Sequence, residues 1–191
     1  MNKKIKQFSV TPGMTTFPVQ LTFSSGIETP RYIICAFQSI PITLTKQKIN
    51  NLIFNIPSNQ YKVINVNNVN LYINGNIYQL NDYQNDFTTN KVARWYNEYK
   101  KFIMTYNNND FDENNCISYQ DFNNLNRIYV FDVSKQLRET ITNGIANVKI
   151  EFNFITPIPV AANAAVIVYC MSLYDRIWSL KSDGTKQYII K

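Results

Sequence analysis

Acidic and amide side chains gather between residues 110 and 121, in an order that calls for a test of metal binding. In the twelve-residue calcium loop of EF-hand proteins, oxygen ligands stand at positions that include 1, 3, 5, 9 and 12, and a glycine at position 6 allows a sharp turn. Here that glycine is replaced by Asn115, and the final glutamate is replaced by a shorter aspartate. We therefore expect no metal site, and we expect a strand instead of a second helix after the loop. The residues that align with ligand positions are Asp110, Asp112, Asn114, Ser118 and Asp121.

Charged residues interrupt two apolar segments near the C-terminus. Asp132 is followed by Lys135 and Arg138, and Asp175 is followed directly by Arg176. A buried charge is costly unless it is paired, so we expect these carboxylates to accept hydrogen bonds from basic side chains or from turn amides. A carboxylate-based catalytic site would need a second carboxylate close by, and none lies nearby in the sequence. We predict structural ion pairs and no catalytic role.

The chain of 191 residues contains no histidine. This removes histidine-based acid-base catalysis, the Ser-His-Asp and Cys-His arrangements, and the usual ligand of zinc and non-haem iron. The five glycines are spread along the chain, and no Gly-x-Gly-x-x-Gly or Walker-type loop is present. The sequence predicts a protein that is not an enzyme and that needs no cofactor.

Three cysteines, Cys35, Cys116 and Cys170, cannot all pair within the chain, and two of them lie in apolar runs. A thiol in such a run behaves as a small hydrophobic side chain, which favours a reducing compartment. The N-terminus lacks the apolar core of a signal peptide, and no apolar stretch reaches the roughly 18 residues of a membrane span. We expect a chain that stays inside the cell that makes it.

The net charge of +6 includes a small cluster of lysines at the N-terminus, Lys3, Lys4 and Lys6. We interpret residues 1–16 as a basic arm or linker exposed to solvent. Such an arm could touch nucleic acid or an acidic surface, and it is the one part of the chain that could contact nucleic acid, but we expect a solvated terminus instead.

Strand patterns dominate the remaining sequence, residues 17–191. Apolar and polar residues alternate over residues 17–23, which predicts a strand with one buried face, whereas residues 31–38 are apolar on both faces. Asn74 and Gly75 both tolerate the positive φ of a type I′ turn and predict a hairpin between strands at residues 69–73 and 77–80. Three further strands are expected at residues 128–133, 147–155 and 164–174, with a later turn at Asp183 and Gly184.

One segment, from about Asn90 to Tyr106, has helical spacing instead. Its apolar residues recur at intervals of three and four, so that they fall on one stripe of a helix. The stripe could bind a partner or a membrane surface, but we expect it to pack on the protein's own sheet. This predicted face consists of Val92, Trp95, Tyr96, Tyr99, Phe102, Ile103 and Tyr106.

Several of these motifs occur in the same order in a known family of viral proteins. Together they resemble the C-terminal jelly roll of double-jelly-roll capsid proteins, in particular those of Polinton (Maverick) elements and adintovirus-like agents. The similarity runs from about Phe17 to the end of the chain. Its motifs are residues 30–38, the hairpin at 69–78, Asp86-Phe87, residues 131–136, 148–154 and 159–163, Asp175-Arg176 and residues 182–186.

The resemblance implies an all-β fold, an eight-stranded antiparallel jelly-roll sandwich with one amphipathic helix in a connecting segment, formed by residues 17–191 as a single domain. It also implies a structural protein that assembles with itself or with a companion jelly roll, as trimers, into a virion shell inside the host cell. A full member of this family carries two jelly rolls, and only about 16 residues precede Phe17 here. The chain is then one half of a longer product or a single-roll relative.

Two other functions fit the same fold. A jelly roll can be a carbohydrate- or protein-binding module, for which exposed aromatic side chains such as Trp178 and Tyr188 would form a stacking platform. The chain could also be a host-domesticated scaffold derived from an integrated viral element.

Overall fold

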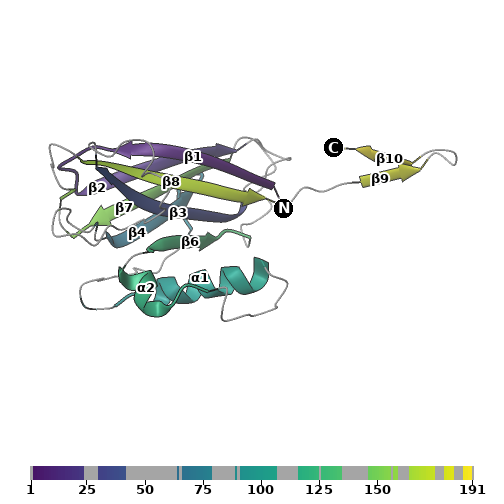
Figure 1. Cartoon of the computed structure of the whole chain (residues 1–191). Helices are drawn as coiled ribbons and strands as arrows, with labels where there is room; N and C mark the ends of the chain where they lie inside the picture. The colour runs from purple at the N-terminus through teal and green to yellow at the C-terminus, as the bar shows by residue number, and fades with distance from the viewer. Residues whose placement is uncertain are drawn as a thin grey trace.

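In the computed structural model, two four-stranded antiparallel sheets face each other across an apolar core (Figure 1). The first sheet has the strand order β1-β8-β3-β6, made by β1 (Asn2–Val10), β8 (Ala164–Tyr174), β3 (Pro30–Pro41) and β6 (Ile128–Asp132). The second has the order β2-β7-β4-β5, made by β2 (Thr16–Phe23), β7 (Ala146–Phe154), β4 (Val66–Ile73) and β5 (Asn76–Ile77). This arrangement confirms the predicted eight-stranded jelly-roll sandwich. The structure describes residues 2–23, 30–41, 64, 66–78, 89, 91–106, 116–124, 126–134, 146–155, 157–158, 164–174, 179–182 and 187–190.

The core between the sheets is rich in aromatic rings. Phe37 of the first sheet meets Phe152 and Phe154 of the second edge-on, with ring centroids 4.9 and 5.7 Å apart. On β2 the alternate residues from Phe17 to Phe23 are buried, as the sequence pattern predicts. Rings that interlock in this way fix the spacing between the sheets and make the sandwich a rigid body.

The N-terminal segment that we expected to be a basic arm is instead a strand. β1 pairs with β8 along its whole length, from Asn2 opposite Tyr174 to Val10 opposite Val166. Val10 is buried and Phe8 packs against the core. The prediction of an arm was wrong because lysines obscure the alternation, and an edge strand tolerates lysine.

Helix α1 (Ala93–Tyr106) lies along β6, at one side of the sandwich (Figure 1). Its Trp95 ring packs edge-on against Tyr129 and Phe131, with ring centroids 5.2 and 5.3 Å apart. Further along the helix, Phe102 packs against Tyr32 at 5.1 Å. The helix therefore packs on the protein's own sheet, which supplies the apolar surface that its stripe requires.

A second helix, α2 (Tyr119–Asn124), stands where we expected a strand, so that expectation was wrong. Ser118 caps this helix: its Oγ accepts a hydrogen bond from the Asp121 amide at 3.0 Å and donates one to Asp121 Oδ2 at 2.8 Å. Serine followed three residues later by an acidic residue is a helix start signal. Two residues that aligned with calcium ligands thus begin a helix.

The Asn74-Gly75 turn adopts the predicted conformation, with φ of 49° and 84°. Asn74 also joins the turn to β7, because its amide donates to the Asn147 carbonyl at 2.8 Å and its Oδ1 accepts from the Asn147 amide at 2.9 Å. The returning strand β5 is shorter than the expected strand at residues 77–80, and residues 79–80 lie outside the described residues.

At the C-terminal end, β9 (Ser179–Ser182) and β10 (Gln187–Ile190) form a hairpin that makes a separate two-stranded sheet. In Figure 1 this hairpin, in yellow, lies beyond the end of the sandwich. Asp183 and Gly184 of its turn are outside the described residues. Within the described part of the chain, no helix is long and apolar enough to cross a membrane.

Candidate assembly surfaces

In the part of the chain that the structure describes, four strands lie at the edges of the two sheets, and each has a different feature that opposes pairing with a further strand. Helix α1 packs along β6, and β5 is only two residues long. The third edge strand, β2, carries Pro18, which has no amide hydrogen to donate. The fourth edge strand, β1, is long but carries Lys3, Lys4 and Lys6, and charges of this kind oppose edge-to-edge pairing. Contacts with neighbouring molecules are thus favoured on faces and loops over strand edges.

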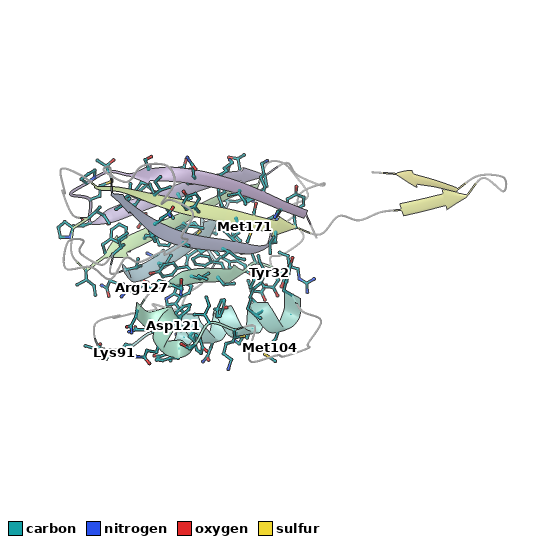
Figure 2. All side chains as sticks on the ribbon, viewed as in Figure 1. Tyr32, Lys91, Met104, Asp121, Arg127 and Met171 are labelled. Atoms are coloured by element: carbon teal, nitrogen blue, oxygen red, sulfur yellow. The ribbon has the colours of Figure 1, made fainter. Side chains whose placement is uncertain are left out.

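The outer face of the first sheet is only half covered. Across one row of paired residues, the exposed fraction rises from 3% at Val130 on β6 and 9% at Ile34 on β3 to 58% at Ile5 on β1, with Met171 on β8 half-buried between them. The buried end of the row is the one nearest α1. Figure 2 labels Met171 on β8 and Tyr32 of β3, which lies on the side of the sandwich nearer the helix. The outer face of β8 and β1 thus remains partly open to solvent. It carries the half-buried apolar residues Ile167, Tyr169 and Met171 on β8, and on β1 the exposed Ile5 stands between the polar Lys3 and Gln7.

The outer face of the second sheet is polar. Lys149 on β7 forms an ion pair with Glu151 at 2.7 Å, and its Nζ lies 5.3 Å from the centre of the Tyr72 ring. The hydrogen bond and the charge of Glu151 raise the pKa of Lys149. A shallow hollow of about 540 Å³ beside them is lined by residues that include Gln20 and Asn147. Because the lysine ammonium already lies over the Tyr72 ring, this ring offers less stacking surface to a sugar.

Arg127 is a buried residue that no pattern in the sequence singles out. Its Nε donates to the Asn123 carbonyl at 3.0 Å, near the end of α2, and its Nη1 donates to the Ile64 carbonyl at 2.6 Å. Burial lowers the pKa of Arg127 to about 10, so the guanidinium remains protonated at neutral pH. The side chain ties α2 to the segment that leads into β4, which is a structural role.

Among the described residues, the partner of the Asp132 carboxylate is Ser134, in a turn. Asp132 Oδ1 accepts hydrogen bonds from the Ser134 amide at 2.9 Å and from Ser134 Oγ at 2.6 Å. The carboxylate therefore has a turn amide as its partner, one of the two arrangements that we expected, and it lies in a structural position. The other predicted partners and charge pairs fall outside the described residues: Lys135, Arg138, Asp175 and Arg176.

The predicted metal loop is described only in part. Asp110, Asp112 and Asn114 lie outside the described residues. Among the residues that are described, no group of three or more histidine, cysteine, aspartate or glutamate side chains could hold a metal ion.

The predicted face of α1 divides into three levels of burial. Val92, Trp95, Tyr99 and Phe102 are buried, and Tyr96 and Ile103 pack partly buried against the core. Tyr106 is an exception to the expectation, since it is 57% exposed. It is the last residue of the helix, and its ring stacks at 5.6 Å on Phe102.

Two of the three thiols are adjacent in the core. Cys35 and Cys170 are directly opposite each other on β3 and β8, with their sulfur atoms 3.0 Å apart, and both are buried free cysteines. Burial, followed by the hydrogen bond with Cys170, raises the pKa of the Cys35 thiol well above its ordinary value. A thiol held in its neutral form is a poor nucleophile and a packing element.

A comparison with protein families identifies the family that has this architecture. A family model described as a double jelly roll-like domain matches residues 5–178. The match begins within β1, includes both helices and runs through β8, and it ends before β9. Neither a curated protein nor a solved structure matches the chain. With most of its length matched, and with the strand order of a jelly roll, the chain belongs to the double jelly roll-like domain family.

Proposed function

We propose that this chain is a structural protein, a capsid-type jelly roll that assembles through protein–protein contacts into a viral or virus-like shell. The observation that carries the proposal is the partly open outer face of β8 and β1, where half-buried apolar residues of β8 adjoin the exposed Ile5. It lies on a sandwich in which each described strand edge has a feature that opposes edge-to-edge pairing. Membership of the double jelly roll-like domain family supports it.

The physical requirements of a shell subunit fit this combination. A subunit that repeats many times must be rigid, and its interlocked aromatic core provides that rigidity. It must also avoid open-ended pairing of strand edges, which leads to aggregation, and yet offer a surface for specific contacts. A half-covered outer face meets both conditions, since it presents apolar area on the face of the sheet while the lysines of the edge strand β1 oppose edge-to-edge pairing.

We further propose that the chain is related to the capsid proteins of Polinton elements and adintovirus-like agents. Its partners would be further copies of itself or a companion jelly roll, arranged as trimers in the assembled state. Assembly would take place inside the host cell, and the product would be the virion. The proposal assigns the chain no enzymatic role, in line with a sequence that lacks histidine.

The mass of the purified chain in solution tests this proposal. Light scattering after size-exclusion chromatography, over a range of concentrations, should show a species heavier than the 22.3 kDa monomer. The fraction of the chain in this heavier species should increase with concentration. The measurement should be repeated after co-expression with any companion jelly roll encoded beside the gene. A strict monomer under both conditions that binds a glycan would instead favour the carbohydrate-binding module.

A further inference from the structure

We propose that Cys35 and Cys170 form a disulfide site that stays reduced inside the cell and closes when the protein meets a peroxide. The bond would join β3 to β8, the two inner strands of the first sheet. Because it lies within the sandwich of a single chain, it does not depend on the proposed assembly.

The two cysteines have the geometry that a disulfide between antiparallel strands requires. They are directly opposite in a regular part of the register, with their sulfur atoms 3.0 Å apart. Directly opposite residues of antiparallel strands have Cα atoms about 4.5 to 5.5 Å apart, and disulfides span Cα distances of about 4.4 to 6.8 Å. To reach the bond length of about 2.05 Å, the sulfur atoms approach by roughly 1 Å, so the bond forms by side-chain rotation without a backbone shift.

The core around the pair holds the two sulfur atoms in contact. Ile33 and Phe37 lie on either side of Cys35 on the same side of β3, and both are buried. The Phe37 ring meets Tyr129 on β6 edge-on at 6.1 Å, and Tyr129 is itself directly opposite Cys35. Close packing of this kind leaves a side chain few rotamers. An oxidised sulfur at one position therefore meets the thiol at the other position before it meets a second molecule.

The pair is more accessible from the β1 edge than from the side of α1. Lys6 on β1 is directly opposite Cys170 and is half-buried, so this end of the row of paired residues is partly open to solvent. At the other end of the row, Tyr129 is 1% exposed and packs edge-on against Trp95 of α1. Burial also raises the pKa of the Cys35 thiol, which makes this thiol a weak nucleophile. The first oxidation is therefore assigned to Cys170, and it is slow because both thiols are buried.

The oxidation balances with hydrogen peroxide as the oxidant. The Cys170 sulfur attacks one peroxide oxygen, the O–O bond breaks, and the thiol proton leaves with the other oxygen as water, which converts Cys170 into a sulfenic acid. The Cys35 sulfur then attacks the Cys170 sulfur, the S–O bond breaks, and the departing hydroxide takes up the Cys35 proton as a second water. The two thiols lose two electrons in total, and the peroxide gains both.

The disulfide should stabilise the sandwich, because it closes a large part of the chain into one loop. Cys35 and Cys170 are 135 positions apart, and the described elements between β3 and β8 are β4 to β7 and both helices. A cross-link that closes a long loop removes conformational freedom from the unfolded chain. For a chain of this size, the effect corresponds to a rise in the melting temperature of about 10 °C.

Peroxide treatment of the full-length chain tests the site. The chain carries Cys116→Ser, which removes the half-buried third thiol, and it is purified in a reducing buffer. After prolonged treatment with hydrogen peroxide and removal of the excess by catalase, the sample is unfolded in an alkylating reagent and digested. Mass spectrometry should find a linked pair of peptides that contain Cys35 and Cys170, and no alkylated cysteine.

Thermal melts followed by circular dichroism provide the second readout. The oxidised chain should melt about 10 °C above the reduced chain, and dithiothreitol should abolish this difference. Cys35→Ala and Cys170→Ala in the same background are the controls, because each can be oxidised at its methionines but cannot form the bond. The oxidised and reduced melts of each control should coincide. The parent chain is compared with itself in its two redox states, so the test holds even where an alanine variant does not fold.

Three results would overturn the proposal. Alkylation of both cysteines after prolonged peroxide treatment would show that the pair is a packing element alone. Linked peptides without a rise in the melting temperature would show that the bond does not stabilise the sandwich. Disulfides between two chains, with none within a chain, would contradict the placement of the two thiols. Light scattering of the reduced chain decides the proposed assembly separately, so either proposal can fail while the other stands.

Discussion

Replacing Trp95 by alanine should detach helix α1 from the sandwich. The indole is 1% exposed and packs between the rings of Tyr129 and Phe131, with ring centroids 5.2 and 5.3 Å away. Both rings belong to β6, the edge strand along which the helix packs. The substitution removes the largest side chain at this contact and leaves a cavity that two aromatic neighbours border.

The size of the expected loss in the free energy of unfolding follows from the area that Trp95 buries. A buried tryptophan removes about 200 to 250 Å² from water, which at about 25 cal/mol per Å² gives an upper estimate of roughly 5 to 6 kcal/mol. Substitutions of this kind in other proteins cost about 3 to 5 kcal/mol, so we expect a loss of about 4 kcal/mol here. A domain has only about 5 to 15 kcal/mol of stability in total, so the variant should be close to unfolding.

Urea denaturation followed by circular dichroism measures this loss. Tyr106→Ala serves as the control on the same helix, because its side chain is 57% exposed, and it should cost less than about 1 kcal/mol. Trp95→Ala should also increase aggregation at moderate urea concentrations, since a detached helix uncovers the β6 edge. A loss below about 1 kcal/mol for Trp95→Ala, or an equal loss for Tyr106→Ala, would refute the packing of α1 on β6.

Three further predictions concern the turn, the thiols and the pH dependence of stability. Burial raises the pKa of Tyr129 above the ordinary value of 10.0, so above about pH 10 this phenol loses its proton in the unfolded chain before it does so in the folded one, and its contribution to stability falls as pH rises. The lowered pKa of Arg127 acts in the opposite direction. In urea unfolding at several pH values, Tyr129→Phe should reduce this fall by up to about 1.4 kcal/mol per pH unit, and an unchanged slope would contradict the burial of the phenol. Gly75→Ala should lower the free energy of unfolding by about 1 kcal/mol in the same assay, because φ is +84° at this position. No atom lies within 4 Å of an added Cβ, so no steric clash adds to this cost. A loss above about 3 kcal/mol would mean that the turn is packed against other atoms. An aromatic disulfide reagent should react quickly with Cys116 alone in the native protein, and with Cys35 and Cys170 only after unfolding; three fast thiols would show that the core is open.

The elements that could be predicted from the sequence are those whose signals are local. The alternation on β2, the Asn74-Gly75 turn and the apolar stripe of α1 each depend on residues that are close in the chain. Their types and approximate positions follow from backbone geometry alone. The packing of this stripe on the protein's own sheet follows as well, because a stripe of aromatic side chains needs an apolar surface. The choice of β6 as that surface does not follow from the sequence.

What could not be predicted depends on partners distant in the sequence or on competing signals. β1 is stabilised by pairing with β8, more than 150 residues away, and its lysines suggested a solvated arm. The pair Ser118 and Asp121 fits both a calcium ligand set and a helix cap, and the helix is the one that forms. Arg127 acquires its role from carbonyl groups that only the folded chain brings near it.

Electron microscopy of the full-length chain, purified alone and after co-expression with any companion jelly roll, tests the proposed shell function most directly. The proposal predicts uniform closed shells, or trimers that form them, in which neighbouring jelly rolls meet through the outer face of β8 and β1. Particles that remain single sandwiches at every concentration, in both preparations, would contradict it.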